Sequence, residues 1–81
     1  MRYGTTTKRS PREVIDQACA FFGPEGELGL PEASTRNNTI TFCSEAGFLS
    51  IACDPTPDGT EVTVLSREYD TWAEQFIRKI G

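Results

Sequence analysis

Residues 39–65 decide the fold, with the sequence TITFCSEAGFLSIACDPTPDGTEVTVL. Three segments of alternating apolar and polar residues are separated here by Ala46-Gly47 and by Asp58-Gly59. Alternation with period two is typical of strands that bury one face, and Asp-Gly is a strong signal for a tight hairpin turn. We therefore predict three consecutive antiparallel strands.

A two-residue turn at 46–47 places Phe42 opposite Ile51. For the next pair of strands we place Val62 opposite Cys53, which puts Val64 opposite Ile51 on the same inner face. With this pairing the large aliphatic side chains all fall on one face, as a correct register requires.

A helix is predicted before the strands, at residues 11–22. Ser10 is a good N-cap, Pro11 suits the first helical position, and Glu13 completes a capping box with Ser10. Gly23 ends the helix. The apolar residues of this segment follow one helical face: Val14, Ala18, Phe21 and Phe22.

Two further elements complete the expected chain. Residues 29–36 contain Pro31, so a strand there has to be an edge strand. A second helix begins near Ser66 or Asp70, either of which can cap it. Its apolar stripe comprises Tyr69, Ala73, Phe76, Ile77 and Ile80, with Trp72 beside it.

The predicted fold is a single α+β domain over residues 1–81, a two-layer sandwich of helix, three- or four-stranded antiparallel β-meander and helix. Both helices are expected on one face of the sheet. The predicted core consists of Val14, Ala18, Phe21, Phe22, Ile40, Phe42, Leu49, Ile51, Val62, Val64, Ala73, Phe76, Ile77 and Ile80.

Charge is distributed unevenly along the chain, whose net charge is −4. Residues 1–9 include Arg2, Lys8 and Arg9 and no acid, and we expect them to form a solvated basic arm. The remainder is acidic and repels phosphate backbones, so no nucleic-acid partner is expected. No segment has the roughly 20 apolar residues of a membrane span, and no signal peptide is evident, so we predict a cytoplasmic protein without a membrane partner.

Residues for catalysis are scarce. The chain has no histidine, which removes the usual general base and the commonest metal ligand. Its cysteines, Cys19, Cys43 and Cys53, are odd in number and lack CxxC spacing. We predict a protein without enzymatic activity, cofactor or metal.

The opposite face of the predicted sheet has no covering element within the chain. Water can cover such a face, but its middle is uncharged, and we predict that it binds a protein partner or a second copy. An edge strand is the other route to a homodimer. The predicted partner-binding residues are Phe48, Leu65, Thr41, Cys43, Ser50 and Thr63. The alternative is a small apolar ligand in a pocket between helices and sheet, near Trp72 and Phe22.

Three segments resemble a small bacterial protein family of unknown function: the opening residues 1–5 (MRYGT), residues 21–23 (FFG) and residues 72–80. The C-terminal half, from residues 58–64 (DGTEVTV) into the last helix, is similar to the corresponding part of helix-grip (START-like) domains. The second resemblance implies a ligand-binding cavity, and neither resemblance assigns a role to any residue.

Overall fold

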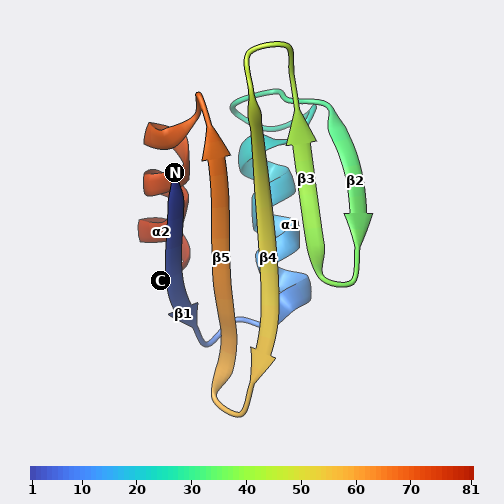
Figure 1. Cartoon of the computed structure of the whole chain (residues 1–81). Helices are drawn as coiled ribbons and strands as arrows, with labels where there is room; N and C mark the ends of the chain where they lie inside the picture. The colour runs from blue at the N-terminus through green and yellow to red at the C-terminus, as the bar shows by residue number, and fades with distance from the viewer.

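The computed structural model describes residues 1–32 and 34–81, and it has five strands and two helices (Figure 1). The predicted α+β class with an antiparallel sheet is confirmed, but the predicted number of three or four strands is wrong. The elements are β1 (Arg2–Thr7), α1 (Pro11–Phe22), β2 (Glu32–Arg36), β3 (Thr39–Cys43), β4 (Phe48–Thr56), β5 (Gly59–Arg67) and α2 (Asp70–Ile80).

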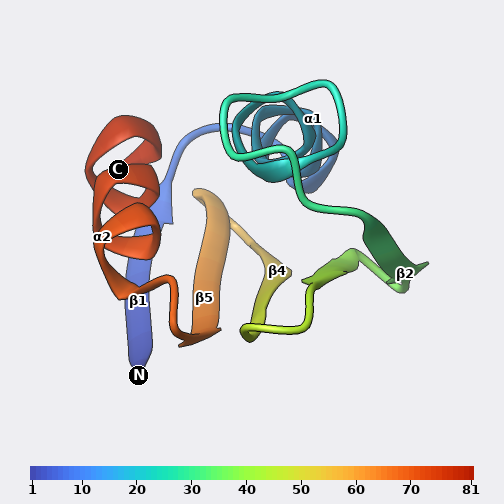
Figure 2. The same cartoon turned by 90° about the horizontal axis from the view of Figure 1, so that it is seen from above.

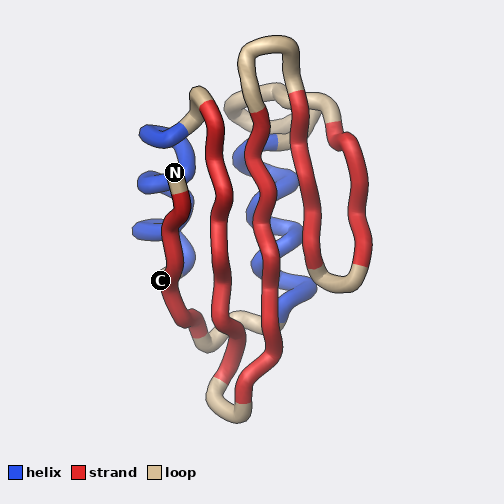
Figure 3. The backbone as a smooth tube through the Cα atoms, in the orientation of Figure 1, coloured by secondary structure: helices blue, strands red, loops and turns tan.

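The fifth strand is β1, which sequence analysis treated as part of a solvated arm. The sheet order is β1-β5-β4-β3-β2, and every neighbouring pair is antiparallel (Figure 3). Pairing of β1 with β5 runs from Arg2 opposite Leu65 to Thr7 opposite Thr60. The segment RYGTTT is rich in residues that favour strands but has too few apolar residues for a visible alternation, so its positive charge alone suggested an arm.

Figure 2 shows α1 above the strands and α2 at the β1 end of the sheet, and the rings of Phe22 in α1 and Phe76 in α2 are 5.0 Å apart in one core. α1 contacts β4 and β3, whereas α2 contacts β1 and β5. The bounds of α1 agree with the prediction, because the capping box forms: the Glu13 N–H donates to Ser10 Oγ and the Ser10 N–H donates to Glu13 Oε1, each at 3.2 Å.

The start of α2 differs from both predicted caps. Tyr69 is the N-cap and makes no side-chain cap hydrogen bond. Ser66 is instead a residue of β5, because pairing with β4 continues to Arg67 opposite Phe48. Asp70 is the first helical residue, and its carboxylate lies 3.8 Å from the Met1 amino nitrogen.

The β3–β4 register is shifted by two residues from the prediction. Phe42 pairs with Leu49, and Ile40 pairs with Ile51. A four-residue loop, closed by a 2.9 Å hydrogen bond from the Ser44 N–H to the Gly47 carbonyl, replaces the expected two-residue turn. An even shift keeps every side chain on its predicted face. The β4–β5 register, with Val62 opposite Cys53, is confirmed.

The edge strand β2 begins at Glu32, after Pro31, and is shorter than the predicted 29–36. A tight turn at Asn37 and Asn38 joins it to β3. Both asparagines have positive φ, 47° and 63°, and asparagine tolerates this conformation better than most residues. Leu30, just before the strand, is buried, and its N–H donates to the Phe22 carbonyl at 2.8 Å.

The core lies between the helices and the sheet. Every predicted core residue is buried except Ile77, which is half-buried, and Leu30 and Cys53 join the core. Phe22 is at its centre, with its ring centroid 5.0 Å from that of Phe76 and 6.1 Å from that of Phe42. This aromatic cluster ties both helices to the sheet.

Candidate functional site

The candidate site is the side of the sheet that faces away from both helices, which we call the outer face. Burial alternates along β5: Val64 is 0% exposed and its neighbour Leu65 is 44% exposed. Residues directly opposite each other on antiparallel strands point to the same side, so the pairing defines this face. It consists of Arg2, Gly4, Thr6, Ser34, Arg36, Thr39, Thr41, Cys43, Phe48, Ser50, Ala52, Asp54, Glu61, Thr63, Leu65 and Arg67.

The middle of the outer face is uncharged and built of small side chains. Leu65, Ser50 and Thr41 form one row across three strands, and the hydroxyls of Thr41 and Ser50 are 3.2 Å apart. The neighbouring row contains Thr63 and Ala52. Because the hydroxyls of Thr41 and Ser50 hydrogen-bond each other, the free-energy cost of removing water from this region is small.

The six residues predicted to bind a partner all lie on the outer face. Leu65 and Cys43 are exposed, and Phe48 is half-buried next to Cys43 across the strands. The structure brings this group together because the shift of the β3–β4 register preserves the side to which each residue points.

The two ends of the outer face carry opposite charge, a feature that sequence analysis missed. At one end lie Arg67 and Arg2, beside Phe48 and Leu65 respectively; we call this the arginine end. Cross-strand pairing and alternation along β1 and β5 place these two arginines, 65 positions apart in the chain, at the same end. No local sequence pattern indicates this.

At the other end, Asp54 of β4 is directly opposite Glu61 of β5; we call this the acidic end. Like charges directly opposite on a sheet destabilise it slightly. Within residues 1–32 and 34–81, the ion pairs are Arg12 with Asp16 and the Met1 amino group with Asp70, so none neutralises the charges at either end of the outer face.

A hollow interrupts the outer face at Gly4. It has a volume of about 630 Å³, and its walls include Arg2, Thr6, Glu61 and Thr63. A Cβ atom added at Gly4 would meet only the Val62 carbonyl, at 3.8 Å, so the space above this residue is open. A side chain from another molecule could enter the hollow and reach the Glu61 carboxylate.

The predicted alternative site, near Trp72 and Phe22, does not form one cavity. Phe22 is 0% exposed and lines none of four prominent hollows on the described residues. Trp72 packs on Phe21 at a centroid distance of 5.3 Å and borders a small hollow with Glu68 to Thr71. The space between helices and sheet is filled by aromatic rings.

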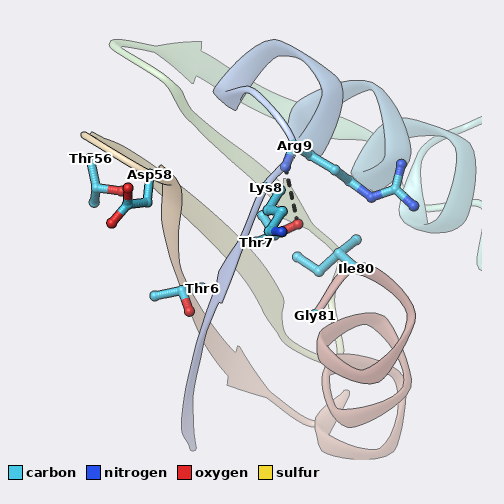
Figure 4. Close-up of a pocket in the computed structure, with 8 residues that line it drawn as sticks. All are labelled: Thr6, Thr7, Lys8, Arg9, Thr56, Asp58, Ile80 and Gly81. Carbon is cyan, nitrogen blue, oxygen red and sulfur yellow. Dashed lines mark hydrogen bonds between the residues drawn. The ribbon is translucent and has the colours of Figure 1, made fainter.

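The largest of the four hollows, about 820 Å³, lies where the β1–α1 link, the β4–β5 turn and the end of α2 meet (Figure 4). Lys8, Arg9 and Asp58 all line it, so it carries charges of both signs. Figure 4 shows the Arg9 guanidinium directed away from Asp58. The backbone N–H of Arg9 donates to Thr7 Oγ1 at 3.3 Å.

Two of the three cysteines are held as neutral thiols. Burial, with a smaller contribution from Asp54, raises the pKa of Cys53 to about 11. Desolvation, followed by Glu32 and Asp16, raises the pKa of Cys19. A nucleophilic cysteine needs the opposite environment, with a lowered pKa. Cys43 is exposed on the outer face, and the chain has no histidine to activate it.

No group of three or more acidic or cysteine residues within 1–32 and 34–81 is placed to hold a metal ion. In the same residues, neither helix has the length and apolarity needed to cross a membrane. Comparisons of the chain with protein-family models, curated proteins and solved structures find no match. The outer face, with its uncharged middle and its charged ends, is therefore the candidate site.

Proposed function

We propose that the protein is a non-enzymatic protein-interaction module that binds through its outer face, with a second copy of the chain as the occupant. The observation that carries this proposal is the uncharged middle of the face around Leu65, which is 44% exposed. Contiguous surfaces without charge are more readily covered by a partner than charged ones, and Leu65 is flanked on this face by small uncharged side chains.

The arrangement of the two layers supports this assignment. Both helices pack into the core on the other side of the sheet, so no element of the described chain covers the outer face. The core is complete without it, because the inner residues of β3, β4 and β5 are already buried against the helices. The outer face is therefore free to pack on another molecule without any change of the fold.

The test is the oligomeric state of the purified chain, measured by sedimentation velocity from 10 µM to 1 mM. We expect a concentration-dependent dimer. Leu65→Asp places a charge in the middle of the outer face, and the dimer should weaken by at least tenfold in Kd because the carboxylate would be desolvated on association.

The matched control is Gln75→Asp, which adds the same charge on the exposed side of α2. It should dimerise as the unmodified chain does. Both variants must retain the circular dichroism spectrum of the folded protein. A chain that remains monomeric at 1 mM, or a Leu65→Asp variant that dimerises normally, would disprove the proposal.

A further inference from the structure

The outer face is polarised along the strands. From one end of β5 to the other, its outer residues are Glu61, Thr63, Leu65 and Arg67. Glu61 and Arg67 are about 20 Å apart, at roughly 3.3 Å per residue, which is about twice the Debye length at physiological salt. The two ends therefore cannot neutralise each other within one chain.

The same polarity recurs on β1 and β4, whereas Arg36 on the edge strand β2 is level with Thr63 and departs from it. On β1, Arg2 is level with Leu65, and on β4, Asp54 is level with Glu61. Each end thus concentrates charge of one sign on two adjacent strands. A partner that covers the face has to present acidic groups to the arginine end and basic groups to the acidic end.

A second copy of this chain meets that requirement in one orientation. When the strands of two face-to-face sheets stay roughly aligned, the two-fold axis between them lies either along the strands or across them. An axis along the strands places the arginine ends of both copies together, and like charges repel. An axis across the strands places the arginine end of each copy over the acidic end of the other.

We infer that the protein forms a homodimer in which the outer faces pack about a two-fold axis lying in the sheet and perpendicular to the strands. The inference rests on the proposed function and names the arrangement of its partner. Arg67 of each copy lies over Glu61 of the other, so the symmetric interface forms this contact twice.

The small residues between the two ends suit this packing. In this arrangement the row of Leu65, Ser50 and Thr41 covers the row of Thr63, Ala52 and Thr39 in the second copy. Side chains of this size allow two sheets to approach to the usual spacing of about 10 Å. Near-neutral rows and charged ends together resemble an interface with an apolar centre and a polar rim.

The hollow at Gly4 provides a specific contact in the same arrangement. Arg2 of one copy is level with Gly4 of the other, on the same strand of the sheet. Its side chain can enter the hollow, one of whose walls is formed by Glu61.

The size of the face predicts a weak dimer. Five strands at about 4.8 Å spacing and a strand length of about 20 Å give about 480 Å² per copy. Stable complexes bury about 800 Å² per partner. We therefore expect a Kd in the high micromolar range that rises several-fold when the salt concentration increases from 50 to 500 mM, because the charged ends are screened.

Charge exchange between two variants tests the orientation directly. In a dimer of Arg67→Glu chains, the new glutamate of each copy faces the unchanged Glu61 of the other. In a dimer of Glu61→Arg chains, the new arginine of each copy faces Arg67 of the other. Each variant alone should dimerise at least tenfold more weakly than the unmodified chain. An equimolar mixture should recover dimers, because position 67 of each copy then faces a side chain of opposite charge at position 61 of the other.

The double variant Arg67→Glu/Glu61→Arg should dimerise within about threefold of the unmodified chain, and sedimentation velocity measures all four samples. Arg78→Glu, on the exposed side of α2, is the control for net charge. A mixture no better than its components would overturn the orientation. If Leu65→Asp still abolishes dimerisation in that case, the interaction module stands and only the orientation fails. A chain that is monomeric at 1 mM overturns both.

Discussion

The two sides of the sheet differ in what holds their residues in place. The inner side is packed against both helices, and residues such as Val62, Val64 and Ile51 are 0% exposed there. On the outer face, directly adjacent positions along the same strands carry threonine, serine and alanine in the middle and charges at the ends. The inner side therefore stabilises the fold, whereas residues of the outer side are free to change and to bind another molecule.

The largest expected difference in stability between the two sides of the sheet is at Phe22. Its ring is 0% exposed and contacts the rings of Phe21, Phe42 and Phe76, so Phe22→Ala leaves a cavity in the only core of the described chain. We expect a loss of about 3–5 kcal/mol in the free energy of unfolding, a large part of the total for a domain of this size.

Urea denaturation followed by circular dichroism measures this loss. Leu65→Ala, on the outer face, is the control and should change the free energy of unfolding by less than about 0.5 kcal/mol. Equal effects of the two substitutions would contradict the division of roles between the two sides of the sheet.

Alkaline pH gives the next largest effect, through Cys53 on the inner side. In the unfolded chain its thiol ionises near the ordinary cysteine pKa of 9.0, whereas burial raises the folded pKa to about 11. The folded state therefore holds more protons between pH 9 and 11, and stability is complete below pH 9 and falls across this interval. The expected loss from Cys53 is on the order of 2 kcal/mol.

Denaturation at several pH values in reducing buffer checks this expectation. Cys53→Ala should flatten the decline between pH 9 and 11, because the variant has no thiol to ionise at that position. Cys43→Ala, on the exposed side, should leave the slope unchanged. An unaltered slope in Cys53→Ala would show that other groups cause the alkaline loss.

The smallest expected change in the free energy of unfolding is at Ser66. It occupies an inner position of β5 and is 4% exposed, and its Oγ has no hydrogen-bond partner in the described chain. Removal of a buried, unsatisfied hydroxyl is favourable, so Ser66→Ala should raise the free energy of unfolding by about 1 kcal/mol. Ser50→Ala, which removes a partnered hydroxyl from the outer face, is the comparison. A destabilised Ser66→Ala variant would contradict this assignment.

Local patterns predicted much of the fold. The extent of α1 depends on Ser10 and Glu13, three residues apart, whose hydrogen bonds form within the segment itself. The β4–β5 register followed from keeping the aliphatic side chains on one face, although the two turn residues are Pro57 and Asp58 and Gly59 is the first residue of β5. The β3–β4 register was wrong by two residues because Ser44 closes a longer loop, and its Oγ also hydrogen-bonds the Tyr69 hydroxyl at 2.5 Å, a contact from another part of the chain.

The candidate site was predicted in part. The uncharged middle of the outer face follows from strand alternation alone, so Leu65 and Ser50 could be assigned to it. The charged ends could not, because Arg2 joins this face only when β1 pairs with β5. The hollow at Gly4 depends on the same pairing.

By itself, the sequence determined the bounds of α1, the hairpin order and the side of the sheet to which each strand residue of 39–65 points. These features depend on hydrogen bonds between near neighbours and on the period of two along a strand. Only the tertiary structure decided that residues 2–7 form a fifth strand and that the outer face has an arginine end and an acidic end. Pairing between segments some 60 residues apart depends on which edge the finished sheet leaves open, and no local pattern contains that information.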